Sequence, residues 1–494
     1  MANNLGEISP VAGFRFLGIS VGVALILFLL LRLILKSWGK SGILVSLWMI
    51  LFFIYGHIYH FLENHPILGV DLGRHRILLV LWLVIFLVSI WLVIRKLSDP
   101  VPWTQVFNAM GLILLIFPLY QFTAHAIRMK QVQSAPTALS HIPYGLTPPA
   151  GPLPDIYYIV LDAYPRQDVL ERRVGYDNTP FLDELRSLGF YVADCSQSNY
   201  AHTELSLAST LNFNYLEDLG INPPTDSMDR YPLIPLVLHS QVRQILASMG
   251  YDMVAFESGH PWTEVTDAEY FFSSANHPIS NNQSLTNLNG LELMVLDNSL
   301  GIVFTDALSH FSKDVANLNV STDVNRPRVL YTLDMMRSVP LGVPSPKFVF
   351  AHIVSPHFPV VFGPNGENVL ITMDVDDETY AKAYQGQITY LNKRVLEIIH
   401  NILTVSAIPP IIIIQGDHGY DLFLEEERTF NLSALYLPNK HYDQLYPQIT
   451  SVNTFRVVFN AYFDGKFELL DDRAYYSTYN LLYDFTLIPN RCDK

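Results

Sequence analysis

The chain has 494 residues, half of which are hydrophobic, and this length accommodates a membrane part together with one large domain. Its formal net charge at pH 7 is −15, but residues 1–130 carry ten Lys and Arg against four Asp and Glu, so the acidity lies in the remainder. An acidic domain without clustered Lys and Arg is unsuited to nucleic acid, because neutralising phosphates needs such clusters. The composition therefore excludes a nucleic-acid partner and favours a domain that works through bound cations.

Four apolar stretches lie in residues 1–130, at 14–35, 42–62, 77–94 and 106–122. The first three meet the length and charge criteria for membrane-spanning helices, whereas the fourth is shorter and contains Asn108. The first stretch is not a signal peptide, because it is long, lacks a small-residue cleavage site and is followed at once by another span. We predict an N-terminal transmembrane α-helical bundle of about four spans.

Basic residues near the spans indicate how the bundle is oriented. Those that favour cytoplasmic loops after the first and third spans are Arg32, Lys36, Lys40, Arg95 and Lys96. Those that oppose this orientation are Arg74, Arg76, Arg128 and Lys130. We expect both ends of the chain outside the cytoplasm, which makes this a multi-pass cell-membrane protein with an extracytoplasmic second domain.

Residues 131–154 are rich in Pro, Ser, Thr and Gly and predict a surface linker, so that 155–494 form the second domain. Short apolar strands are expected at "DIYYIVLD", "YDMVAFES", "KFVFAHIV" and "PPIIIIQ". Helices are expected at "TPFLDELRSLG", with Thr179 as N-cap, at "YPLIPLVLHSQVRQILASMG", and at "DETYAKAYQGQITYLNKRVLEIIHNIL". This alternation predicts an α/β domain with a mainly parallel sheet.

Ionisable residues follow four of these strands. They are Asp162, then Glu257 and His260, then His357, and finally the pair Asp417 and His418. In parallel sheets ligands bind beyond the carboxyl ends of the strands, so these side chains are expected at one edge. The pattern predicts an active site there.

Two carboxylates and an imidazole, Asp162, Asp417 and His418, form a ligand set that suits zinc or manganese and, less well, magnesium. Gly416 and Gly419 are expected to let the backbone turn sharply and the substrate come close. Taken alone, Asp-His-Gly is better interpreted as a polar turn after a strand. Its combination with Asp162 at the same edge favours a divalent metal ion.

A nucleophile is offered by "SNYAHTELSLASTLN", where Thr203 stands at a predicted helix start. A hydroxyl there receives the helix dipole and free backbone N–H groups, and a bound cation would lower its pKa. The alternative is that Thr203 is merely an N-cap.

The order of strand-Asp, Thr before a Ser-rich helix, "SPHFP" and "GDHG" resembles the alkaline phosphatase/sulfatase superfamily. With a membrane bundle in front, the chain is similar to the branch of lipoteichoic acid synthases and phosphoethanolamine transferases. The resemblance implies an alkaline-phosphatase-like fold, with Asp162, Thr203, Asp417 and His418 as metal ligands and Thr203 as nucleophile. His357 matches the histidine that contacts the transferred group or assists proton transfer.

Some residues at this edge have no counterpart in the resemblance. Glu257 and His260 match no motif, and a substrate contact is the role considered for them. His352, on the strand before His357, is interpreted as a core histidine.

Three departures from the superfamily pattern shape the predicted function. Sulfatases need a Cys or Ser in a C/S-x-P-x-R motif, and here Thr203 is followed by "ELS", so phosphoryl transfer is favoured over sulfate ester hydrolysis. Asp162 stands where the lipoteichoic acid synthase branch has Glu. Ligands for a second metal are not identified, so one ion is expected.

We predict a membrane-anchored, metal-dependent phosphotransferase or phosphodiesterase that acts on a lipid- or polyol-phosphate head group. Its substrate is lipid-linked or an anionic component of the cell envelope. The alternatives are a sulfatase and a non-catalytic relative that binds a surface ligand. Cys195 and Cys492 either form one disulfide or are unrelated thiols.

Overall fold

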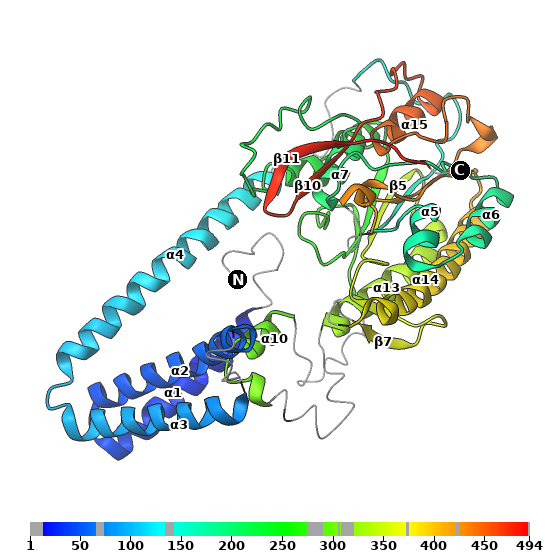
Figure 1. The fold of residues 1–494 in the computed structure, drawn as a ribbon. Coiled ribbons are helices and arrows are strands. Elements are labelled where there is room, and N and C mark those ends of the chain that lie inside the picture. Colours follow the sequence, from blue (N-terminus) through cyan, green and yellow to red (C-terminus); the bar gives the residue numbers. More distant parts are fainter. Residues whose placement is uncertain are drawn as a thin grey trace. The chain divides into compact units, whose positions relative to one another are not determined.

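The computed structural model describes residues 13–65, 74–133, 143–274, 290–304, 307, 321–371, 375–420 and 425–492 (Figure 1). The chain forms two compact units. One unit contains residues 1–127 and 283–324, and the other contains residues 128–282 and 325–494. We call them the helical unit and the α/β unit. The described residues 290–304 thus group with the N-terminal helices, which no sequence pattern indicated.

Four helices are long and apolar enough to cross a membrane, as the sequence predicts. They are α1 (Phe14–Leu35), α2 (Trp38–Asn64), α3 (His75–Trp91), which the π-helix Leu92–Lys96 extends, and α4 (Val101–Gln133). The fourth helix is much longer than its apolar stretch, because helical backbone continues on both sides of it. A further short helix of the helical unit, α10 (Gly290–Asp297), lies far along the chain.

The α/β unit is built on a seven-stranded sheet with the order β2-β9-β8-β1-β5-β3-β4. The strands are β1 (Ile156–Leu161), β2 (Tyr191–Val192), β3 (Asp252–Phe256), β4 (Tyr270–Phe272), β5 (Lys347–Ile353), β8 (Ile411–Gly416) and β9 (Ser433–Tyr436). The β8–β1–β5–β3–β4 part is parallel, and β9 pairs antiparallel with both β8 and β2. The predicted mainly parallel sheet is confirmed.

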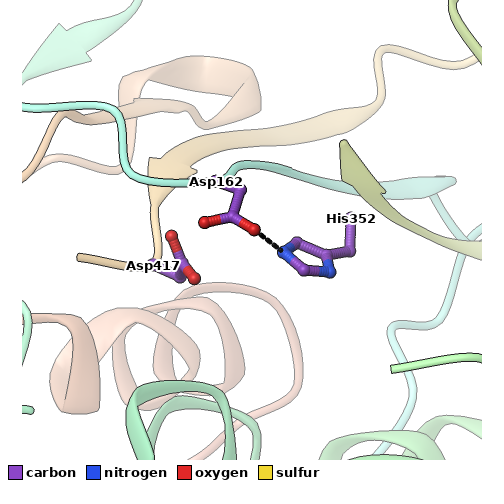
Figure 2. A group of neighbouring side chains, drawn as sticks. All are labelled: Asp162, His352 and Asp417. Carbon is purple, nitrogen blue, oxygen red and sulfur yellow. Dashed lines mark ion pairs between the residues drawn. The ribbon is translucent and has the colours of Figure 1, made fainter. Parts of the chain in front are cut away.

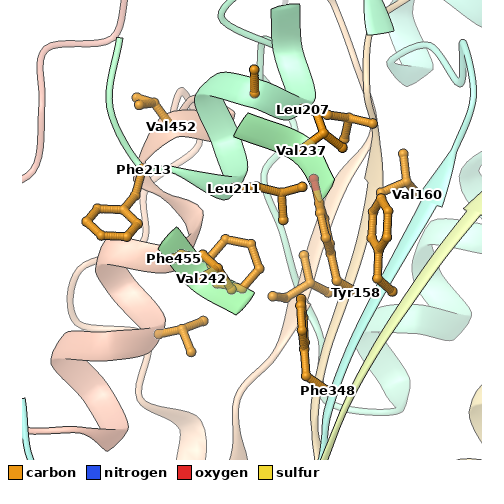
Figure 3. Packing of buried hydrophobic residues seen from close by; sticks show 14 of the residues in the cluster. Tyr158, Val160, Leu207, Leu211, Phe213, Val237, Val242, Phe348, Val452 and Phe455 are labelled. Carbon is orange, nitrogen blue, oxygen red and sulfur yellow. The ribbon is translucent and has the colours of Figure 1, made fainter. Parts of the chain in front are cut away.

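Helices cover both faces of this sheet, because its central strands are buried on both sides. Tyr158 and Val160 face a cluster that includes α7 (Thr203–Leu211), α8 (Ile234–Leu238), α9 (Gln241–Ser248) and α15 (Thr454–Tyr462), part of which Figure 3 shows. Tyr157 and Ile159 face the opposite cluster, with α6 (Thr179–Ser187), α13 (Ser321–Gly342) and α14 (Asp377–Val405). Each such buried side chain contributes about 1.5–3 kcal/mol.

Smaller elements complete the α/β unit. Two hairpins lie outside the main sheet, β6 (Val360–Phe362) with β7 (Asn368–Ile371), and β10 (Ala474–Thr478) with β11 (Leu481–Ile488). The short helix α5 (Gln167–Val169) follows β1. Cys195 and Cys492 form a disulfide, which settles the alternative that the sequence left open.

Two predicted helices differ in detail. Helix α6 has Asn178 as its N-cap, because the Asp177 carboxylate already accepts the Thr179 backbone N–H at 2.9 Å. The single helix expected over 231–250 is two helices that are interrupted at His239. The Ser240 side chain accepts the Arg243 backbone N–H at 3.3 Å and thereby caps a new helix.

Candidate metal centre

Strand register explains why distant aspartates meet. Leu161, the last residue of β1, lies opposite Gly416, the last residue of β8, so Asp162 and Asp417 leave adjacent strands at the same level. Both side chains are buried, with exposed fractions of 2% and 1%. The predicted convergence of strand ends is therefore present in the fold.

His352 joins these two aspartates from β5. It lies opposite Val160, two residues before Asp162, and alternate strand residues point to the same face. Its Nε2 is 3.3 Å from Oδ2 of Asp162, and one ligand atom each from Asp162, His352 and Asp417 lie within 4.8 Å of one another (Figure 2). His352 is thus part of the site, whereas the sequence interpretation assigned it to the core.

His418 completes the group from the turn after β8. Its Nδ1 donates to the Gly419 carbonyl at 2.6 Å, which orients the ring and directs Nε2 into the site. Nε2 lies 3.7 Å from Oδ1 of Asp162, 3.6 Å from Oδ2 of Asp417 and 3.3 Å from Oγ1 of Thr203. The four ligands named from the sequence therefore come together.

Thr203 reaches the site from the start of α7, on the face to which Val160 points. The residues Glu204 to Leu211 are all buried, whereas Thr203 is partly exposed. Ser206 Oγ donates to the Asp417 carbonyl at 2.5 Å and joins the helix to the end of β8. His202 is the N-cap, so Thr203 is the first helical residue and the N-cap alternative does not hold.

The two carboxyl groups differ in their electrostatic surroundings. Burial opposes ionisation of Asp162, but the neighbouring imidazoles of His357, His352 and His418 outweigh it and hold the pKa of this carboxyl well below its usual range. Burial raises the pKa of Asp417, and the adjacent Asp162 charge adds to that rise while His418 opposes it. Like charges this close cannot both ionise without compensation.

A divalent cation fits this donor set. Oδ1 of Asp162 and Oδ2 of Asp417 are buried without a hydrogen-bond partner, and both face Nε2 of His418. Buried polar atoms normally have partners, because their desolvation is otherwise uncompensated. Two carboxylate oxygens and imidazole nitrogen are ligands that zinc and manganese accept.

His357 and His260 lie beside the centre. The His357 backbone N–H donates to the Asp162 carbonyl at 3.0 Å, and its Nδ1 donates to the Phe358 carbonyl at 2.7 Å. The His260 ring centroid is 6.3 Å from that of His352, and burial lowers the His260 pKa to about 4. Of these two, His357 has the closer described link to the aspartates.

Glu257 has a different environment. Its carboxylate lies 3.4 Å from Nε of Arg328 and accepts hydrogen bonds from Ser273 and Ser274. These contacts engage both of its oxygens, so the structure gives a local ion pair where the sequence suggested a substrate contact.

The two glycines around Asp417 and His418 serve close packing of the protein's own backbone. A Cβ at Gly416 would collide with the Tyr164 carbonyl, and one at Gly419 would collide with the Glu427 carbonyl. Neither glycine has the positive φ expected for a sharp turn. Because both glycines are small, the backbone after β8 packs against the backbone of Tyr164 and Glu427, and His418 is held at the site.

Comparisons with known proteins give only structural likenesses. The integral membrane protein lipooligosaccharide phosphoethanolamine transferase A (EptA) from Neisseria meningitidis is 13% identical with a TM-score of 0.41, covering 90% of this chain and 84% of that chain. The C-terminal periplasmic domain of EptC from Escherichia coli, in complex with Zn, is 11% identical with a TM-score of 0.42, covering 67% and 88%. Lipoteichoic acid synthase LtaP from Listeria monocytogenes is 13% identical with a TM-score of 0.39, covering 70% and 81%.

No protein-family model matches the chain, and neither does any curated protein. These solved structures are phosphoethanolamine transferases and a lipoteichoic acid synthase, the two kinds of protein that the sequence motifs resemble. At such low identity the likeness concerns the fold alone.

Proposed function

We propose that this chain is a membrane-anchored, metal-dependent phosphotransferase or phosphodiesterase that uses Thr203 on a lipid- or polyol-phosphate head group. The observation that supports it most is the position of the Thr203 hydroxyl. Oγ1 lies 3.3 Å from Nε2 of His418, which in turn faces the two buried carboxylates. A partly exposed hydroxyl beside a buried cation site at a sheet edge suits nucleophilic attack on an anionic substrate.

Asp162, Thr203, Asp417 and His418 would hold the ion, and we add His352 to this set. Zinc or manganese suits the oxygen and nitrogen ligands best, and magnesium is the alternative. Bound there, the ion would polarise a phosphoryl oxygen and lower the pKa of the Thr203 hydroxyl.

Groups of the protein itself would supply the other two requirements of the reaction, which are binding of the anionic substrate and protonation of the leaving oxygen. The N-terminus of α7 presents backbone N–H groups to an anion at Thr203. The Thr203 hydroxyl gives its proton to water, the bond from Oγ1 to phosphorus forms while the bond to the leaving oxygen breaks, and His357 supplies or positions a proton for that oxygen. The phosphothreonine then passes its group to a glycan, a lipid or water.

Two further features support the expected location. Four helices suffice to anchor the chain in a membrane, where a lipid-linked or anionic cell-envelope substrate is available. The disulfide between Cys195 and Cys492 is typical of an oxidising compartment, which supports an extracytoplasmic α/β unit.

The decisive experiment is mass spectrometry of the Thr203 peptide after the purified full chain is incubated with membrane lipids. The wild-type protein should gain the mass of a phosphorylated head group on Thr203, and that mass identifies the donor. Thr203→Ala should gain none while keeping its metal content, and Thr203→Ser serves as the control that retains a hydroxyl. Turnover that persists in Thr203→Ala would refute the proposal that Thr203 is the nucleophile.

The choice between phosphoryl and sulfate chemistry rests on the residue type. Thr203 cannot form the aldehyde that a sulfatase requires, so hydrolysis of a chromogenic sulfate ester is not expected. Sulfate release that depends on Thr203 would favour the sulfatase alternative instead.

A further inference from the structure

A cavity of about 660 Å³ lies in the helical unit, between α1, α2, α3 and the end of α10 with the residues that follow it. Its wall on α1 consists of Phe16, Ile19, Ser20, Val23 and Leu27. Apart from Ser20, all the side chains that line the cavity are aliphatic or aromatic. We call this cavity the apolar groove.

The wall that α10 and the following residues contribute is held firmly on the helices. Arg15 forms an ion pair with the buried Glu292, with Nε 2.6 Å from Oε1. The Leu300 backbone N–H donates to the Phe52 carbonyl at 2.8 Å, and Gly56 allows the backbone of Asn298 to approach α2 closely. The apolar groove is therefore preformed, as ligand sites usually are.

Neither water nor empty space suits this groove. The hydroxyl of Ser20 and the indole N–H of Trp48, which has no described hydrogen-bond partner, are few polar groups for a space of this volume, because each buried water needs two to four partners. An empty apolar space of this volume would forfeit the dispersion contacts of its whole lining. The helices α1, α2 and α3 that line the groove are all long and apolar enough to span a membrane, so the medium that reaches the groove is lipid hydrocarbon.

The shape of the groove matches one lipid chain. Its lining positions on α1 follow the spacing i, i+3, i+4, i+7 and i+11, which places them on one face of the helix. At about 1.5 Å per residue this face extends roughly 16 Å along the helix. One leaflet is about half of the roughly 30 Å hydrocarbon core, so the groove spans the depth of one leaflet.

We propose that the apolar groove binds one acyl chain of a membrane phospholipid at a defined place between α1, α2 and α3. The proposal rests on the helical unit alone and is independent of the chemistry proposed for Thr203. It adds a specific lipid site to a set of helices that would otherwise serve only as an anchor.

The test uses the full chain in phosphatidylethanolamine vesicles in which a fraction of the lipid carries a photoreactive diazirine on one acyl chain. After irradiation, the labelled residues are located by mass spectrometry. Labelling on α1 should concentrate on Ile19, Val23 and Leu27. Filling the groove with Val23→Trp should lower this labelling on the order of tenfold, because the indole takes the space of the acyl chain.

Val21→Trp is the matched control. Val21 and Val23 lie on the same helix with exposed fractions of 49% and 47%, but only Val23 lines the groove. The control should keep the wild-type labelling. If Val23→Trp does not yield a monodisperse protein, Ser20→Phe fills the same space and should give the same loss.

The outcomes separate this proposal from the proposed function. Labelling spread evenly around α1, or an equal loss in the groove-filling and control variants, would overturn the lipid site. Thr203→Ala should keep full labelling, whatever its effect on turnover. A protein that labels in the groove but never modifies Thr203 would retain the lipid site and lose the proposed enzyme.

Discussion

Strand β1 carries a buried aspartate at each end, and the two ends differ in how the negative charge is met. At the amino end, Oδ2 of Asp155 lies 2.6 Å from Nζ of the fully buried Lys347. Asp155 also accepts hydrogen bonds from Ser345 Oγ at 2.9 Å and from the Lys347 backbone N–H at 3.1 Å. At the carboxyl end, the described ion-pair partners of Asp162 are the imidazoles of His352 and His418, and Oδ1 accepts no hydrogen bond.

From this difference we propose that the amino end of β1 serves stability and that the carboxyl end serves function. The amino end neutralises its charge with an ammonium from the same chain and satisfies the carboxylate with donors. The carboxyl end gathers a second buried carboxylate, Asp417, and surrounds both carboxylates with imidazoles, which commonly bind metal ions in proteins. A buried charge left in this state points to a partner from outside the chain.

The largest effect is expected from Asp417→Asn. This variant should lose metal binding and activity at the carboxyl end of β1 and keep the fold. Oδ1 of Asp417 accepts the backbone N–H groups of Ala163 and His418, each at 2.9 Å, and an asparagine carbonyl can accept both. The substitution removes the negative charge and replaces Oδ2, which faces Nε2 of His418, by an amide nitrogen that does not bind a cation. Metal content should fall below one ion per chain, and modification of Thr203 should drop by on the order of 10³-fold, since metal polarisation is worth several kcal/mol.

Elemental analysis of the purified chain and mass spectrometry of the Thr203 peptide measure both effects. Thermal unfolding of the metal-free protein is the control, and it should be no less cooperative than in the wild type, because burial disfavours the ionised form of Asp417 and raises its pKa. A full complement of metal in Asp417→Asn would place the cation elsewhere.

The second-largest effect is expected at the amino end of β1, and it should appear only in the free energy of unfolding. Asp155→Asn leaves Lys347 buried beside a neutral amide, which should cost about 3–5 kcal/mol of unfolding free energy. Metal content and Thr203 modification should be unchanged in the folded protein. Denaturation of the full chain, followed by tryptophan fluorescence, gives the measurement.

The double variant Asp155→Asn with Lys347→Met is the matched control for this pair. It removes both charges, so it should recover much of the loss, as replacing buried ion pairs by apolar groups often does. If Asp417→Asn proved more destabilising than Asp155→Asn, the assignment of the two ends to function and stability would be reversed.

Much of the site was predictable from the sequence, because it follows from strand ends. The run of four isoleucines before Asp417 and the apolar run before Asp162 predict parallel buried strands, and parallel strands deliver their carboxyl ends to one edge. Spacing alone does not give the register. Since Val160 lies opposite His352, Asp162 and His352 share a face, and this pairing is visible only once β1 and β5 are aligned.

Other features depend on tertiary contacts that no local pattern contains. The break at His239 arises because Ser240 caps a new helix, although the apolar periodicity continues through it. The described residues 290–304 group with the helical unit through contacts such as the Arg15–Glu292 pair, whose members are 277 positions apart. Local propensity carries no information on such a pairing.

The smallest effect is expected from His352→Gln. This variant tests whether His352, on β5, belongs to the metal centre proposed at the carboxyl end of β1. The His352 ring is fixed from behind, since Nδ1 lies 3.0 Å from Oγ1 of Thr263, while Nε2 faces Asp162. If His352 is a ligand or orients Asp162, metal affinity should fall by about 10–100-fold. Titration of the metal-free chain with zinc measures this change.

Thr263→Val separates a ligand from a core residue. This variant leaves the His352 imidazole in place but removes the hydroxyl that orients it, so zinc affinity should fall less than in His352→Gln. A core histidine would behave differently, because either change would lower the unfolding free energy and leave zinc affinity at the wild-type value. That result would identify His352 as a core residue. The proposed metal centre would then consist of Asp162, Thr203, Asp417 and His418.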